Sequence, residues 1–216
     1  MHALIVLGGD APDARLLERC MRSADLVLAA DRGLEAFHFA GLTPDMLIGD
    51  MDSVAPEVLA RYEGKLAEHR LSCIKDDTDG VDALDVAIRR KADRVTFLGA
   101  LGGRLDHALA NLMLLVRAHR RGVFAQILAQ GVRIVRVDGS LELRGAKGDT
   151  VSLLPLGEAR GVSLRGFFYP LEDATLTTDY PIGVSNVVTR QEASVCVREG
   201  DLFLFHYFKE KEEMEG

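Results

Sequence analysis

The sequence predicts an α/β fold in two parts, a Rossmann-like parallel-sheet domain followed by a small antiparallel β-sandwich. Two observations support this prediction. Apolar, strand-like runs alternate with helical periods through about the first 128 residues, which is typical of a parallel sheet covered by helices. From about Gly131 the apolar runs become short, turns separate them, and no helical period lasts longer than one turn. We therefore expect one domain over residues 1–130, a second over 131–208 and a charged tail over 209–216.

The first part contains five apolar runs that we interpret as core strands. The first is too short for a signal peptide and ends in two glycines, as expected of a strand buried on both faces. The expected strands cover residues 3–7, 26–30, 46–48, 94–98 and 124–128.

Helical spacing fills the gaps between these strands. We expect a helix over about residues 12–21, with Leu16, Leu17 and Cys20 on its inner side, and another over 34–40, which stops at Gly41. A third helix should run from Thr78 or Asp79 to about residue 90. The inward residues that the pattern predicts for the third helix and for a fourth, after Gly103, are Val81, Leu84 and Ile88, then Leu105, Leu109, Leu112 and Val116.

The second part contains seven short apolar runs. Alternation within each run and the Gly, Pro or charged residues between them predict antiparallel strands. The runs cover residues 133–137, 141–143, 150–154, 162–164, 174–177, 194–197 and 202–207.

Composition narrows the classes of function. The chain has 216 residues, 48% of them hydrophobic, which is ordinary for a globular protein. A formal net charge of −7 argues against a nucleic-acid binder or a binder of anionic membranes. Three widely spaced cysteines favour reduced thiols, and no stretch is long enough to span a membrane. These features predict a cytoplasmic protein.

The most distinctive polar residues lie at or near the ends of predicted strands. The clusters are Gly8-Gly9-Asp10, Asp31-Arg32-Gly33, Gly49 to Ser53 and Gly99 to His107, while Lys75 to Asp79 leads into a helix. Ligands of an open parallel sheet bind outside the carboxyl ends of its strands. We therefore expect these clusters to form one site.

The stretch Gly49-Asp50-Met51-Asp52-Ser53 is the centre of this prediction. If the strand tip stays extended, Asp50 and Asp52 point to the same side, where two carboxylates repel each other unless a cation lies between them. A solvated, Asp-rich turn is the alternative interpretation of such a motif taken alone.

The residue types in these clusters indicate a divalent cation and a phosphate. Acidic groups outnumber basic ones, and several carboxylates together favour a hard cation such as Mg²⁺. Arg104 can bind phosphate as a bidentate fork and Lys75 as a point charge, while Gly102 and Gly103 let backbone amides approach an anion. Asp79 could equally be a helix cap, and His107 a packing or capping residue.

Five motifs in this order resemble the bacterial type of the thiamine pyrophosphokinase family. They are Asp31-Arg32-Gly33, Pro44-Asp45 to Ser53, Lys75-Asp76-x-Thr78-Asp79, Gly102-Gly103-Arg104-x-Asp106-His107 and Gly183-x-Ser185-Asn186. The resemblance covers nearly the whole chain. It implies a nucleotide-binding N-terminal domain, a thiamine-binding β-sandwich and a homodimer with thiamine at its interface. The implied reaction is ATP plus thiamine to thiamine diphosphate plus AMP, with Mg²⁺.

The resemblance also implies roles for individual residues. The catalytic set would be Asp50, Asp52, Asp76 and Asp79, and the metal ligands Asp50, Asp52 and Asp76. Ser185 and Asn186 would bind thiamine. The nucleotide would be bound by Asp31, Lys75, Thr78, Gly103, Arg104, Asp106 and His107.

Two departures from the family pattern and two alternative functions follow. Val81 stands where many relatives have an acidic residue, which questions any role for Asp82, and Met51 replaces the usual Phe. One alternative is a pyrophosphokinase for another hydroxymethyl heterocycle, such as a pterin. The other is a non-catalytic sensor of nucleotide or thiamine phosphate, although a degenerate sensor would be expected to lose the metal carboxylates or Arg104.

Overall fold

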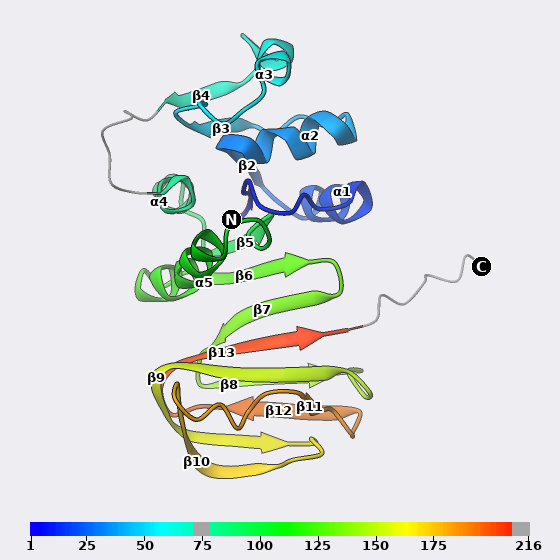
Figure 1. Cartoon of the computed structure of the whole chain (residues 1–216), viewed down its shortest axis with the longest axis vertical. Coiled ribbons are helices and arrows are strands. Elements are labelled where there is room, and N and C mark those ends of the chain that lie inside the picture. The colour runs from blue at the N-terminus through cyan, green and yellow to red at the C-terminus, as the bar shows by residue number, and fades with distance from the viewer. Residues whose placement is uncertain (71–77, 209–216) are drawn as a thin grey trace, which may run out of the picture. The chain divides into compact units, whose positions relative to one another are not determined.

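A computed structural model describes residues 1–70 and 78–208, apart from the side chains of residues 68–70. It has a mixed α/β fold that divides into two compact units, Met1–Gln130 (unit 1) and Gly131–Gly216 (unit 2) (Figure 1). Within the described ranges, no helix has the length and apolar character that crossing a membrane requires.

The described part of unit 1 is built on six parallel strands in the order β4-β3-β2-β1-β5-β6. All five predicted strands are confirmed to within one or two residues. The apolar runs of β1, β2, β3 and β5 are buried on both faces, whereas β6 is buried mainly at alternate residues. The strand β4 was not predicted, since its sequence is mostly polar. The strands are β1 (His2–Val6), β2 (Leu26–Ala30), β3 (Met46–Gly49), β4 (Ala67–Arg70), β5 (Arg94–Leu98) and β6 (Phe124–Ala129).

Within residues 1–70 and 78–130, five α-helices cover these strands. Figure 1 shows α1 and α2 on one side of the strands and α4 and α5 on the other. The helices α1 to α3 share one core cluster with Leu4, Val6 and Leu47, residues of the same strand face. The helix bounds are α1 (Ala14–Arg22), α2 (Leu34–Ala40), α3 (Pro56–Tyr62), α4 (Asp79–Arg89) and α5 (Leu105–Arg120).

The inward faces predicted for two helices were partly wrong. The pattern placed Leu105 and Leu109 in the core, but they are 81% and 61% exposed. The reason is that α5 packs against β6 and α4, and its buried residues all lie in its later turns. In α4, Leu84 is buried as predicted, whereas Val81 and Ile88 are only half-buried. The other buried positions are mostly small residues, Gly80, Ala83 and Ala87, which allow closer packing on the strands.

Unit 2 consists of antiparallel strands, and most of the predicted runs are confirmed. The runs 150–154 and 162–164, predicted as two strands, form the single strand β9, which continues through Gly157 and Gly161 at φ 80° and 68°. The two-residue β11 was not predicted. The strands are β7 (Val132–Val137), β8 (Ser140–Arg144), β9 (Thr150–Arg165), β10 (Leu171–Thr177), β11 (Asn186–Val187), β12 (Glu192–Cys196) and β13 (Glu199–Tyr207).

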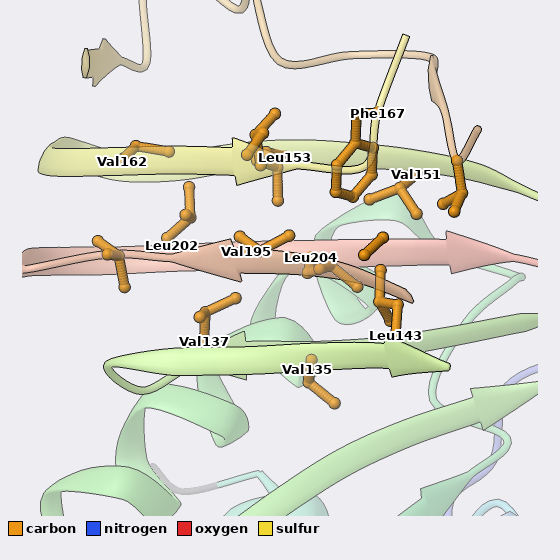
Figure 2. Close-up of a cluster of buried hydrophobic side chains, with 14 of the residues drawn as sticks. Val135, Val137, Leu143, Val151, Leu153, Val162, Phe167, Val195, Leu202 and Leu204 are labelled. Atoms are coloured by element: carbon orange, nitrogen blue, oxygen red, sulfur yellow. The ribbon is translucent and has the colours of Figure 1, made fainter. Parts of the chain in front are cut away.

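The long strand β9 organises the core of unit 2. Its first part pairs with β13 and β11, and its second part pairs with β12 and β10. Alternate side chains of these strands and of β7 and β8 therefore meet in one buried cluster, which includes Val151, Val195 and Leu204 (Figure 2). Phe167 belongs to this core, whereas its neighbours Phe168 and Tyr169 are exposed.

Candidate functional site

The candidate site lies at the carboxyl edge of the parallel strands of unit 1. Four neighbouring strands, β3, β2, β1 and β5, end here side by side, so the loops that follow them are also neighbours. Two backbone hydrogen bonds join the loops after β1 and β5: Gly9 N donates to Gly99 O (2.8 Å) and Asp10 N to Leu101 O (2.7 Å).

Glycines allow these loops to lie in contact. A Cβ on Gly9 would lie 2.3 Å from Leu101 O, and one on Gly102 about 2 Å from the Asp10 carboxylate. Neither position can hold a larger residue without moving backbone or displacing Asp10. Gly103 is different: no described atom lies within 4 Å of its added Cβ, and its φ of 62° is the reason for glycine there.

Three carboxylates gather beside these loops. Asp31 follows β2, while Asp50 and Asp52 follow β3, and one oxygen from each lies within 4.8 Å of the others. Asp50 and Asp52 are therefore close, as predicted, but not for the predicted reason. The strand tip does not stay extended, because Met51 has φ 65° and turns the chain. Asp50 Oδ1 accepts a hydrogen bond from Asp52 N at 3.2 Å within this turn.

Asp31 is the buried member of the cluster, with only 8% of its surface exposed. Ser53 Oγ donates a hydrogen bond to Asp31 Oδ2. Oδ1 is buried and has no hydrogen-bond partner among the described residues. A buried carboxylate oxygen without a partner is expensive, and a bound cation would satisfy it.

Burial and mutual repulsion raise the pKa values of two acid groups at this edge. The pKa of Asp52 is raised, first by the charge of Asp50 and then by desolvation and the charge of Asp31. The pKa of Asp79 is raised to about 6, mainly by burial and further by the charges of Asp31 and Asp50. Asp79, the first residue of α4, thus lies in the field of the same cluster. These carboxylates fit a divalent cation, whose charge would remove the repulsion.

The residues that begin α5 form a separate, exposed pair. Arg104 donates through Nε to Asp106 Oδ1 (3.1 Å) and through Nη2 to Oδ2 (2.5 Å). The hydrogen bond from Arg104 is the main reason why the pKa of Asp106 falls to about 2. Asp106 also accepts from the backbone N–H of His107, which is exposed in the first helical turn. Arg104 is therefore oriented by an ionised neighbour, and its guanidinium remains accessible to an anion.

The predicted residues before α4 are only partly described. Lys75 and Asp76 lie outside the described residues. Thr78 is the exposed N-cap residue of α4, and in the described structure its side chain makes no capping hydrogen bond. Asp79 is the first residue of the helix rather than its cap.

The predicted pair in unit 2 has two different environments. Ser185 is exposed and has φ 59°, and its N–H donates to Ser152 Oγ at 3.0 Å. Asn186 is 5% exposed, and its amide bonds backbone groups: Nδ2 donates to Tyr169 O (2.7 Å), while Oδ1 accepts from Tyr169 N (3.0 Å) and Val187 N (2.9 Å). Asn186 thus fixes the segment that carries Tyr169, and only Ser185 is exposed to a ligand.

The sequence prediction missed three residues that shape this edge. Ser53 belonged to a recognised motif but had no role, and Asp10 ended a recognised cluster in the same way. Asn111 had no signal beyond being a polar residue within an apolar helix. Its Nδ2 donates to Ala100 O at 2.9 Å and ties α5 to the loop after β5.

Comparison with known proteins agrees with this architecture. The family model described as "Thiamin pyrophosphokinase, catalytic domain" matches residues 17–127, and "Thiamin pyrophosphokinase, vitamin B1 binding domain" matches residues 136–202. Thiamine pyrophosphokinase of Bacillus subtilis is 27% identical over 183 residues, which are 83% of this chain and 86% of the relative.

Solved structures show the same fold. The crystal structure of thiamine pyrophosphokinase from Bacillus subtilis aligns with a TM-score of 0.84 at 23% identity, over 97% of this chain and 100% of that one. Thiamin pyrophosphokinase from Geobacillus thermodenitrificans aligns with a TM-score of 0.81 at 26% identity, over 98% and 99%. Since the catalytic-domain model alone matches more than half of the residues, the chain belongs to the thiamine pyrophosphokinase family.

Proposed function

We propose that this chain transfers the β,γ-pyrophosphoryl group of ATP to the hydroxyl of thiamine, giving thiamine diphosphate and AMP. The observation that carries the proposal is the cluster of Asp31, Asp50 and Asp52 at the strand edge of a chain that belongs to this family. A non-catalytic sensor would not need three converging carboxylates. A pterin-like acceptor is disfavoured by the match of unit 2 to a vitamin B1 binding domain.

Mg²⁺ is the proposed metal, held by Asp50 and Asp52 together with Asp31. The unpartnered Asp31 Oδ1 and the raised pKa of Asp52 support a cation here. Asp76 remains a predicted ligand. When bound, the metal would neutralise the phosphates, which is the main electrostatic requirement of phosphoryl transfer. This role differs from the nucleotide-binding role that the sequence suggested for Asp31.

The nucleotide phosphates would lie against the loop 99–103 and the start of α5. Backbone amides at a helix N-terminus favour anions, and the guanidinium of Arg104 can bind two phosphate oxygens. Asp106 would orient Arg104 through the paired hydrogen bonds described above. Gly103 would allow close approach, while Lys75, Thr78 and His107 remain predicted contacts.

Asp79 is the proposed acceptor of the thiamine hydroxyl proton. Its pKa of about 6 makes it a stronger base near neutral pH than an ordinary carboxylate, and it is half-buried beside the acidic cluster. Asp76 is the other candidate. The remaining task, in-line placement of the hydroxyl and the β-phosphorus, is one of positioning.

We further propose, as the sequence predicted, that the two units bind different ligands. Residues 1–130 would be a Rossmann-like nucleotide-binding domain, and 131–208 a β-sandwich that binds thiamine. Ser185 would contact thiamine directly, and Asn186 would act by fixing the neighbouring backbone. A location in the cytoplasm remains a prediction.

A homodimer is proposed from the exposed apolar side chains of unit 2. Phe168, Tyr169 and Tyr180 are 64%, 65% and 68% exposed, which is unusual for large aromatic residues of a monomer. A second copy of the chain would cover them and place thiamine at the interface. Light scattering at micromolar concentration tests this, and an active monomer would contradict it.

A product assay tests the reaction itself. The chain is incubated with ATP, Mg²⁺ and either thiamine or a hydroxymethyl pterin, and the nucleotides are separated. We expect AMP and thiamine diphosphate in equal amounts. Release of ADP would indicate γ-phosphoryl transfer, and AMP formed only with the pterin would identify the other acceptor class. Binding of both ligands without any product would indicate a sensor.

A further inference from the structure

Ser53 contacts the carboxylate cluster without belonging to it. Its hydroxyl donates to Asp31 Oδ2, while Asp31 Oδ1 is the oxygen without a partner among the described residues. The two oxygens of one buried carboxylate therefore have different environments. Among the described residues, one oxygen is bonded by a neighbour and the other has no partner.

The backbone around Asp31 is constrained, so the direction of its carboxylate depends on its side-chain torsions. Asp31 has φ 46°, uncommon for a residue with a side chain. Gly49 lies against it, because a Cβ there would be 3.1 Å from Asp31 Cβ. Gly33 is equally constrained, since its Cβ would lie 2.0 Å from Val6 O. The terminal torsion of an Asp side chain, however, has a broad minimum. A single hydrogen bond at one oxygen is enough to select an orientation.

We infer that Ser53 is a positioning residue for the metal site. Its hydroxyl holds Asp31 Oδ2, so that Oδ1 is presented to the same cation as Asp50 and Asp52. The inference rests on the proposed function, since it assumes that this cluster binds a divalent cation. Hydrogen bonds to the second oxygen of a ligating carboxylate commonly tune metal affinity in this way.

Three expectations follow from this role of Ser53. Removing the hydroxyl should weaken binding of the cation about 10-fold, the lower end of the range for outer-shell partners. Ser53→Thr keeps a hydroxyl and should retain most of the affinity. Because Ser53 acts through Asp31, its removal should have little further effect once Asp31→Asn has been made.

The test measures binding of Mn²⁺ alone to the full chain, by electron paramagnetic resonance of the free ion, so that turnover is not the readout. The variants are Ser53→Ala, Ser53→Thr, Asp31→Asn and the double variant Ser53→Ala/Asp31→Asn. Ser23→Ala is the matched control, since Ser23 Oγ donates to Cys20 O (2.9 Å) before the opposite end of β2. If Ser53→Ala does not fold, Ser53→Cys, with its weaker donor, has the same expectation.

Each result supports or overturns the inference. It is supported if Ser53→Ala is about 10-fold weaker while the Thr variant and Ser23→Ala resemble the parent. It is overturned if Ser53→Ala binds Mn²⁺ like the parent while Asp31→Asn does not. This holds even if the melting temperature of Ser53→Ala falls. It is also overturned if Ser53→Ala lowers the affinity for Mn²⁺ as much in the Asp31→Asn background as in the parent. The same holds if Ser53→Thr binds Mn²⁺ as weakly as Ser53→Ala. A parent that takes up no Mn²⁺ refutes the metal site of the proposed function, and this inference with it.

Discussion

The candidate sites of the two units differ in whether the protein itself satisfies their polar groups. At the carboxyl edge of unit 1, three carboxylates lie within 4.8 Å, and Asp31 Oδ1 has no partner among the described residues. In unit 2 the amide of Asn186 is satisfied by the backbone, and nearby exposed side chains such as Tyr169 and Ile182 are largely apolar. Unsatisfied charge suits a cation and phosphates, whereas a satisfied, largely apolar surface suits a ring-shaped organic ligand or a second protein chain.

The largest expected effect is on turnover, from removing one charge in the unit 1 cluster. Asp50→Asn and Asp52→Asn should each lower kcat about 100- to 1,000-fold, because a group that neutralises phosphate charge is lost. Glu18→Gln, which changes an exposed carboxylate on α1, is the matched control. Steady-state release of AMP at saturating thiamine measures the effect. Turnover within a factor of a few of the parent in both Asn variants would contradict the catalytic role of the cluster.

The second effect is on stability and comes from unit 2. Asn186→Ala should lower the free energy of unfolding by about 2–3 kcal/mol, because it removes the hydrogen bonds of a buried amide to the backbone of Tyr169 and Val187. Ser185→Ala, one residue earlier and exposed, should change it by less than about 0.5 kcal/mol. Urea unfolding curves of the two variants make the comparison. Equal losses would mean that Asn186 is not the structural member of this pair.

The third effect separates the ligands of the two units. Ser185→Ala should weaken thiamine binding about 5- to 10-fold, the loss of one neutral hydrogen bond, and leave ATP binding unchanged. Asn186→Ala should also affect thiamine more than ATP, to the extent that it folds. Calorimetric titrations with each ligand measure this. Parallel losses for both ligands would contradict the division of labour.

The sequence was sufficient to predict the features of the fold that depend on local residue patterns. The five apolar runs of unit 1 form strands, most of them buried on both faces, and the carboxyl ends of parallel strands necessarily share one edge. The prediction failed where packing against another element determines which residues are buried. Leu105 and Leu109 have the correct spacing for a core face, but the elements packed on α5 lie along its later turns. The turn at Met51 and the burial of Asn186 likewise depend on contacts that no local pattern encodes.

The last effect is a pH dependence of the apo protein. The pKa of Asp79 is raised from 3.8 to about 6, so the folded state holds this proton more tightly than the unfolded chain. Its stabilising contribution is full below pH 3.8 and is lost as the pH rises to about 6. Asp79→Asn should therefore flatten the stability profile over that range. The quantity to compare is the difference between parent and variant in urea unfolding at pH 4.5 and pH 7. An unchanged difference would show that Asp79 has an ordinary pKa.

The central claim, that the unit 1 carboxylates form a cation site, is tested most directly by melting temperatures of the parent, Asp50→Asn and Asp52→Asn with and without Mg²⁺-ATP. Without ligand, neutralising one charge relieves repulsion, so both variants should melt no lower than the parent. With Mg²⁺-ATP at about 100 times its dissociation constant, the parent should gain about 5–10 °C and the variants much less, which reverses the order. Variants that melt lower without ligand, yet gain as much as the parent from Mg²⁺-ATP, would show that these aspartates are part of the scaffold and do not hold the cation.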